Sequence, residues 1–268
     1  MSKRLLEPAD LSPRLGERDL LVVHVASAPS YAAGHVPGAV LVTPAELVAG
    51  KPPAPGDLPN RDRLTALFTR LGYAPDLEIV AYDDEGGGWA GRFLWTLDVI
   101  GHDRWAYLDG GIHAWAADGA PIETAERSRA TRVAHIPVDD RPTARADEIL
   151  RRLDDPTLLV WDCRSAEEYR GRKSGSARAG HIPGAVHLDW LDLMDPARAL
   201  RLRTDLDTLL AARGIDRERD VVTHCQTHHR SGLSYLVGRL LDFPRIRAYP
   251  GSWSEWGNRT DTPVVSGP

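Results

Sequence analysis

The sequence has few cysteines and no long hydrophobic run. Only two cysteines, Cys163 and Cys225, occur among its 268 residues. Two thiols cannot supply the disulfide framework of a small secreted domain, so we expect a cytoplasmic protein with reduced cysteines. No apolar stretch approaches the roughly 20 residues of a membrane-spanning helix, and segment 1–7 turns polar too early for a secretion signal. We therefore expect no membrane partner.

The sequence also lacks an excess of positive charge. Its formal net charge is -5, whereas a nucleic-acid-binding domain needs a basic face, so we expect no nucleic-acid partner. Hydrophobic residues make up 42% of the chain and charged residues 26%, which is the composition of a globular protein with a buried core. A length of 268 residues exceeds that of most single domains and predicts two.

An internal repeat supports two domains. Four blocks recur in the same order at a separation of about 140 residues. The matching pairs are 20–25 with 158–163, 34–39 with 180–185, 79–83 with 221–225, and Gly110 and Trp115 with Gly251 and Trp256. The separation grows within the second copy, which predicts an inserted surface loop near 171–176. We expect one domain at 1–125, a charged linker at 126–142 and a second domain at 143–268.

Each copy alternates short apolar runs with helical patterns, as a parallel sheet with crossover helices does. In the first copy we expect strands near 21–25, 39–42, 79–82 and 105–108, and helices near 61–71 and 89–100. The predicted fold class is α/β, with a parallel sheet flanked by helices in each domain. Both copies contain Gly-His-x-Pro-Gly-Ala, whose turn-forming residues predict that His35 and His181 hydrogen-bond the backbone.

The candidate catalytic residue is Cys225. It ends an apolar, β-branched run that predicts a buried strand, and an amphipathic helical pattern begins after Ser231, which we expect to be the N-cap. Open α/β sheets bind ligands at this edge. The helix N-terminus, Arg230, and His228 and His229 in their charged forms would favour the thiolate. Inward-facing loop amides would complete a cup for an anion.

The two copies differ at this position. Asp83 stands where the second copy has Cys225, and an acidic, glycine-rich loop follows it. A carboxylate is no soft nucleophile and repels anions, so we expect the first copy to be catalytically silent and to cover one side of the second copy's cleft. In the second copy, Arg164 follows a strand end. We expect its guanidinium to bind the anion, the alternative being an ion pair with Asp162 or Glu168.

These motifs together resemble the rhodanese family. The resemblance rests on the duplicated domain, the Tyr31-x-x-x-His35-Val36-Pro37-Gly38-Ala39 element, Asp162-x-Arg164, the Cys225 loop and the block 249–256. It implies a tandem-domain thiosulfate sulfurtransferase with an inactive first domain and no cofactor. Cys225 would carry sulfur as a persulfide, from thiosulfate to cyanide, a thiol or a sulfur-acceptor protein. Substrate would be bound by Arg164, Arg230, Gln226, Thr227, His228 and His229. We expect a monomer.

Four alternatives stay open. The loop lacks the Cys-Gly-x-Gly pattern of 3-mercaptopyruvate sulfurtransferases, yet that donor is not excluded. A phosphatase or arsenate reductase on a related fold uses Cys-x5-Arg, but here Cys225 and Arg230 have one residue fewer between them, which gives a smaller cup. A non-catalytic binding module would not need Cys225. His224, Cys225, His228 and His229 could ligate a metal, but adjacent histidines on a tight loop converge poorly, so we expect none.

Overall fold

The computed structural model describes residues 4–267, which form two units with a parallel sheet each. The first unit comprises Met1–Leu47, Pro59–Asp139 and Met194–Leu202, and the second comprises Val48–Leu58, Asp140–Leu193 and Arg203–Pro268. Neither unit is continuous in sequence, because each includes a short segment from the other half of the chain. No helix in the described part of the chain has both the length and the apolar character needed to cross a bilayer.

The first unit is built on a five-stranded sheet in the order β1-β5-β4-β2-β3, with every pair parallel. The strands are β1 (Leu5–Leu6), β2 (Leu20–Val25), β3 (Val40–Val42), β4 (Glu78–Asp83) and β5 (Trp105–Leu108). Their helices are α1 (Pro8–Leu11), α2 (Ala28–Ala33), α3 (Arg61–Arg70), α4 (Gly88–Val99) and α5 (Gly111–Ala117). An antiparallel pair, β8 (Met194–Asp195) with β9 (Arg201–Leu202), completes the unit. α4 follows β4 directly and is buried along nearly its whole length.

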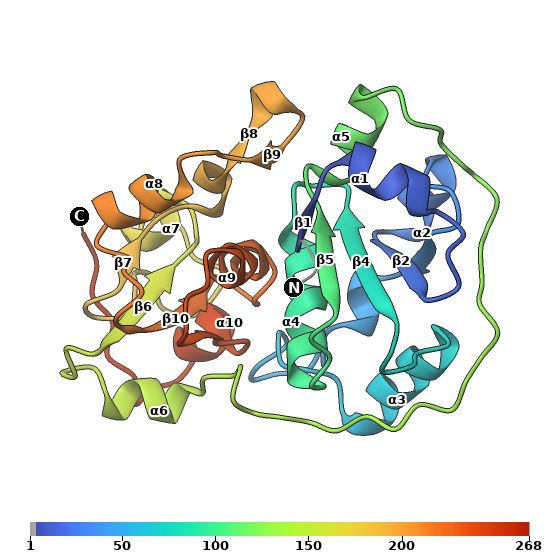
Figure 1. Cartoon of the computed structure of the whole chain (residues 1–268). Helices are drawn as coiled ribbons and strands as arrows, with labels where there is room; N and C mark the ends of the chain where they lie inside the picture. Colours follow the sequence, from blue (N-terminus) through green and yellow to red (C-terminus); the bar gives the residue numbers. More distant parts are fainter. Residues whose placement is uncertain (1–3, 268) are drawn as a thin grey trace. The chain divides into compact units, whose positions relative to one another are not determined.

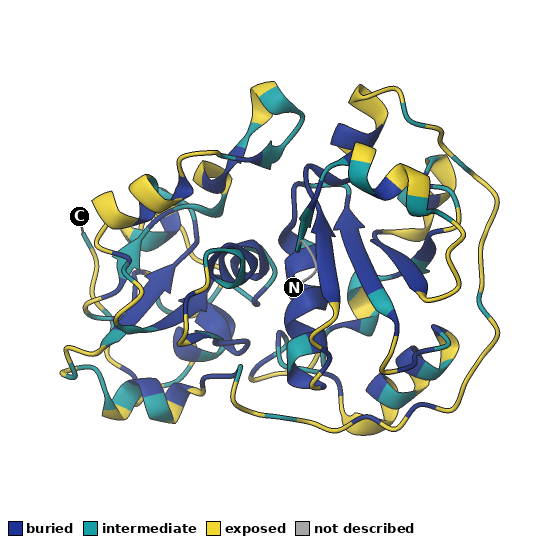
Figure 2. Ribbon diagram, in the orientation of Figure 1, coloured by how far each residue is buried: buried dark blue, intermediate teal, exposed yellow. Residues whose placement is uncertain are grey.

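The second unit repeats this plan with four parallel strands in the order β11-β10-β6-β7. The strands are β6 (Leu158–Asp162), β7 (Val186–His187), β10 (Asp220–His224) and β11 (Ile246–Ala248). The helices are α6 (Ala146–Arg151), α7 (Ala166–Tyr169), α8 (Leu206–Ala212), α9 (Arg230–Leu240) and α10 (Ser252–Trp256). The sheets are buried, and exposed residues gather on loops and on the outer sides of helices such as α8 (Figure 2). This is the α/β fold class that the sequence predicts.

Most predicted elements occur where the patterns place them. The four strands and two helices expected in the first copy are present, with ends shifted by at most a residue or two. Segment 171–176 is an irregular, mostly exposed loop, as expected. His35 and His181 each contact a backbone carbonyl through Nδ1, at 2.9 Å from Tyr31 and 2.7 Å from Tyr169. Both histidines therefore stabilise turns.

The structure corrects one expected cap and describes the linker. α9 begins at Arg230 with His229 as its N-cap, so Ser231 lies inside the first turn and is not the cap. Residues 124–140 contain neither helix nor strand. This segment is not loose, because the amide of Arg132 donates to the carbonyl of Thr69 within the first unit. Its extended backbone is thus satisfied by hydrogen bonds outside any sheet.

Candidate active site around Cys225

Cys225 lies immediately after β10, on the loop that leads into α9. Only 1% of the residue is exposed. The Ser252 hydroxyl fixes the loop: it accepts the amides of Cys225 at 3.3 Å and His228 at 3.1 Å, and it donates to the carbonyl of Tyr249 at 2.8 Å. His228 itself adopts a φ of 55°, a left-handed conformation that turns the loop sharply. One hydroxyl thus anchors both ends of the turn behind the cysteine.

The surroundings of Cys225 favour the thiolate. Burial alone would raise the pKa of the thiol, but the positive charge of Arg230 and the amide and hydroxyl of Ser231 outweigh burial and lower it. His229 acts in the same direction. A lowered pKa at a helix N-terminus is the setting in which cysteine is a nucleophile, so Cys225 stays the candidate nucleophile.

Arg230 is held by a carboxylate that sequence reasoning had not paired with it. Its guanidinium makes a bidentate ion pair with Glu168 on α7, at 2.6 and 2.9 Å. Glu168 also accepts the amide and hydroxyl of Ser165 in a capping box, which fixes the carboxylate. The pair positions the Arg230 charge near Cys225 and partly neutralises it. The spacing of Ser165 and Glu168 was visible as a capping box, but its contact with Arg230 depends on tertiary packing.

The corresponding loop of the first unit binds an anion of its own. The Asp83 carboxylate accepts the amides of Glu85, Gly86 and Gly87 on one oxygen, at 3.2, 3.1 and 2.8 Å, and that of Ala90 on the other, at 2.9 Å. Asp83 is fully buried, and burial raises its pKa to about 6. α4 begins five positions after Asp83, as α9 does after Cys225, so the loops have equal length. The first loop therefore converges four amides on one carboxylate. In the second loop the His228 amide donates to the Ser252 hydroxyl instead, and the amide that acts on the Cys225 thiol is that of Ser231.

Comparisons with known proteins agree with this duplicated arrangement. The family model described as rhodanese-like domain matches the chain twice, at residues 7–118 and 145–259. The chain belongs to the rhodanese family. It is 51% identical over 260 residues to a thiosulfate sulfurtransferase of Azotobacter vinelandii, covering 97% of this chain and 96% of that one. A thiosulfate sulfurtransferase of Pseudomonas aeruginosa is 50% identical with the same coverage.

Solved structures show the same rhodanese fold. An anaerobic ergothioneine biosynthesis enzyme from Chlorobium limicola superposes with a TM-score of 0.87 over 99% of this chain and 70% of its own, at 22% identity. At that identity the likeness concerns the fold alone. The predicted family and the tandem arrangement of two rhodanese-like domains are thereby confirmed.

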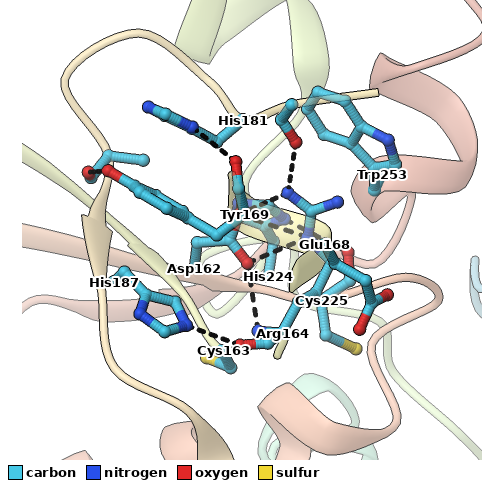
Figure 3. Close-up of polar contacts among 12 residues, drawn as sticks. Asp162, Cys163, Arg164, Glu168, Tyr169, His181, His187, His224, Cys225 and Trp253 are labelled. Carbon is cyan, nitrogen blue, oxygen red and sulfur yellow. Dashed lines mark hydrogen bonds and ion pairs between the residues drawn. The ribbon is translucent and has the colours of Figure 1, made fainter. Parts of the chain in front are cut away.

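The structure corrects the prediction that Arg164 binds the substrate. Arg164 is fully buried, and its guanidinium pairs with Asp162 through Nε at 3.0 Å and Nη2 at 2.6 Å. Nη2 also donates to the carbonyl of Gly180 at 2.7 Å, and the group lies 4.3 Å from the ring centroid of Trp253. Figure 3 shows this cluster on one side of the strand ends and the Cys225 sulfur on the other. Arg164 is thus a structural cation paired with Asp162, and this pair is fully buried, whereas the alternative interpretation was a pair at the surface.

The cluster under the strand ends also contains His224. Its Nε2 lies 3.5 Å from Asp162, and burial lowers the pKa of this histidine, which favours the neutral ring. Burial opposes ionisation of Asp162 as well, yet the charge and hydrogen bonds of Arg164 hold the pKa of Asp162 below its ordinary value. The carboxylate is therefore the fixed partner of the buried guanidinium.

The other predicted loop residues take different positions. His228 is fully buried, and its Nδ1 contacts the Ser231 hydroxyl at 2.8 Å, so its ring supports the loop and does not face a ligand. The amide nitrogen of Gln226 donates to the Ser176 hydroxyl at 3.1 Å, which ties the catalytic loop to the inserted loop. Thr227 and His229 are half-exposed, with the His229 ring 5.8 Å from that of Trp190. Gln226, Thr227 and His229 are thus half-exposed, and His228 is the buried one of the four.

Proposed function

We propose that this rhodanese is a thiosulfate sulfurtransferase that works through a Cys225 persulfide. The observation that carries the proposal is the lowered pKa of a thiol on a loop between a strand end and a helix N-terminus. Relatives about half identical along nearly the whole chain bear the name thiosulfate sulfurtransferase, which supports the choice of donor. Catalysis is assigned to the second domain, predicted at 143–268, with a silent first domain at 1–125 and a linker at 126–142.

The reaction is a double displacement. The Cys225 thiolate attacks the outer sulfur of thiosulfate, the sulfur–sulfur bond of the donor breaks, and sulfite leaves with the bonding electrons. A thiophilic acceptor, such as cyanide or a thiol, then attacks the outer sulfur of the persulfide and restores the thiolate. The amide and hydroxyl of Ser231 and the charge of Arg230 stabilise negative charge at this sulfur in both states.

Donor binding is assigned to the groups near the thiol. Arg230 supplies the positive charge for the sulfonate end, and this part of the donor competes with Glu168 for the guanidinium. The loop residues Gln226, Thr227 and His229 form the rest of the cup, and His228 holds it in shape through Ser231. No role in donor binding is assigned to Arg164. One chain carries the whole of this machinery, so the protein is proposed to act as a monomer.

Intact-mass measurement tests the proposal directly. Persulfide sulfur is first removed from the purified enzyme with cyanide, the enzyme is then incubated with thiosulfate, and its intact mass is measured. We expect the mass to rise by that of one sulfur atom and to return after cyanide is added, with Cys225→Ala unchanged throughout. A parallel incubation with 3-mercaptopyruvate tests the other donor. An unchanged wild-type mass with thiosulfate would refute the assignment.

A further inference from the structure

The two cysteines lie side by side at the ends of neighbouring strands. β6 and β10 pair in parallel with Asp162 opposite His224, and each cysteine is the next residue of its strand. The ladder extends to Cys163, whose amide donates to the carbonyl of His224 at 2.9 Å. Neighbouring strands are spaced about 4.8 Å apart, which lies within the Cα separation of about 4.4–6.8 Å that a disulfide spans.

Both thiols also point to the same face of the sheet. Side chains alternate along a strand, so Cys163 shares a face with Trp161, and Cys225 shares one with Thr223. The Thr223 hydroxyl donates to the carbonyl of Ser231 on α9 at 3.4 Å, which shows that this face is covered by α9.

Contacts with α9 place both sulfurs on that face. Ser231 lowers the pKa of the Cys225 thiol, and the buried hydroxyl of Ser234, one turn later on the same helix, lowers that of Cys163, so both thiols lie near this helix. Asp162 and Arg164 occupy the opposite face, and Figure 3 shows both sulfur atoms, apart from each other, on the side away from the Arg164 guanidinium. A disulfide needs Cβ atoms about 3.5–4.5 Å apart, slightly less than the spacing of about 4.8 Å between strands. A change of χ1 rotamers together with a small approach of the two strand ends would therefore bridge the pair.

We propose that Cys163 is a resolving thiol that traps oxidised Cys225 as an intrachain disulfide. The oxidant is a peroxide. The Cys225 thiolate attacks a peroxide oxygen, the O–O bond breaks, and the released hydroxide takes up a proton, which leaves a sulfenic acid. The sulfur of Cys163 then attacks the sulfur of Cys225, the S–O bond breaks, and the departing hydroxide takes the Cys163 proton to form water. Two thiols are oxidised and one peroxide is reduced to two waters.

In the resting enzyme the resolving thiol is buried and protonated. Both cysteines are free, and Cys163 is fully buried with its thiol donating to the carbonyl of Trp161 at 3.5 Å. Burial raises the pKa of Cys163 well above its ordinary value, so the group stays protonated and does not compete with acceptors for the persulfide during turnover. Cys163 reacts when Cys225 carries an oxygen, because that hydroxide can accept the thiol's proton as it leaves.

Peptide mapping after peroxide treatment tests the inference. Sulfur-free wild-type enzyme, Cys163→Ala and Cys163→Ser are treated with two molar equivalents of hydrogen peroxide, blocked with an alkylating agent and digested. We expect the wild type to yield one linked peptide pair joining Cys163 and Cys225, and to regain full activity in dithiothreitol. Both variants should be as active as the wild type when reduced, but after peroxide they should carry a sulfinic acid on Cys225 and regain little activity.

The outcomes separate this inference from the proposed function. A wild type without the linked peptides, or variants that recover as fully as the wild type, would overturn the resolving role. The linked peptides report only on the reactivity of the two thiols, so they are informative even if thiosulfate is not the donor. Ser replaces the thiol with minimal change of volume, and the map of the wild type alone decides the matter if neither variant folds.

Discussion

Arg230 lowers the pKa of Cys225, and its ion pair with Glu168 weakens this effect, so both side chains control how readily the thiolate forms. Replacing Arg230 with Gln removes the cation, so we expect the pKa of Cys225 to rise. The rate of alkylation by iodoacetamide, measured against pH, gives this pKa directly. The pH at which sulfur transfer by this variant sets in should be higher than for the wild type, and its KM for thiosulfate should increase.

Glu168→Gln provides the opposite change. It removes the carboxylate that neutralises Arg230, so the pKa of Cys225 should fall below that of the wild type. Equal shifts in the same direction for both variants would contradict the electrostatic account.

Single-residue tests also separate the two cysteines. Cys225→Ala should abolish sulfur transfer with the fold intact, whereas Cys163→Ala should retain nearly full activity under reducing conditions. Circular dichroism and a thiosulfate:cyanide assay measure both properties. Retained activity in Cys225→Ala would move the nucleophile to another residue.

At this scale the sequence predicts the reactive residue better than its partners. Cys225 and the first residue of α9, Arg230, are five positions apart, so the local pattern is enough to place a cation near the candidate thiol. The error over Arg164 could have been avoided, since strand alternation places Asp162 and Arg164 on one face, away from Cys225. The contact between Glu168 and Arg230 could not be predicted, because their separation along the chain encodes no distance in space.

At the scale of elements, the catalytic loop depends on α10. The Ser252 hydroxyl binds two loop amides, and Ser252→Ala would leave both without that partner in a buried position. We expect a loss of about 2 kcal/mol in the free energy of unfolding and a lower kcat, since the loop that holds the thiol loosens. Denaturant unfolding and steady-state kinetics measure the two effects.

Ser254→Ala is the matched control for this element. Its hydroxyl donates to the carbonyl of Gly251 on the same helix and touches no amide of the loop. The kcat of Ser254→Ala should stay near that of the wild type. A comparable fall in kcat for both variants would mean that α10 as a whole, and not the Ser252 hydroxyl, supports the loop.

Longer elements were predictable and the shortest ones were not. α4, β2 and β4 carry enough residues to display a period, and their positions were found to within a residue or two. β1 and β7 have two residues each, too few for any alternation to be recognised. The start of α9 was misplaced because Ser231 has the composition of a cap, whereas the loop ends earlier, at His229.

For the molecule as a whole, the first domain is a folded copy whose anion site is filled by its own side chain. Asp83→Asn would replace one carboxylate oxygen with an N–H donor that faces amide donors, so we expect the stability to fall by about 1–3 kcal/mol. The exposed residue Asp103 lies in the same unit, and Asp103→Asn should leave stability unchanged. Unfolding curves measure both.

Sulfur transfer by folded Asp83→Asn should equal that of the wild type, because the chemistry is assigned to the second domain. A large loss of activity in protein shown to be folded would contradict the silent role of the first copy. The duplication of the domain was predictable, because the sequence repeats. Each unit also includes a short segment from the other half of the chain, and these segments could not be predicted because they do not belong to the repeat.

Because each unit includes a segment from the other half of the chain, the two domains cannot be separated by cutting the gene between the repeats. A Cβ on Gly56, which lies in the first half of the sequence, would come within 2.3 Å of the Thr227 carbonyl oxygen on the catalytic loop. A gene cut at the boundary between the repeats would therefore encode the second domain without the residues around Gly56 that lie against the Cys225 loop. The second unit includes Val48–Leu58 in addition to the second repeat, so a gene divided between the repeats would not encode that unit whole.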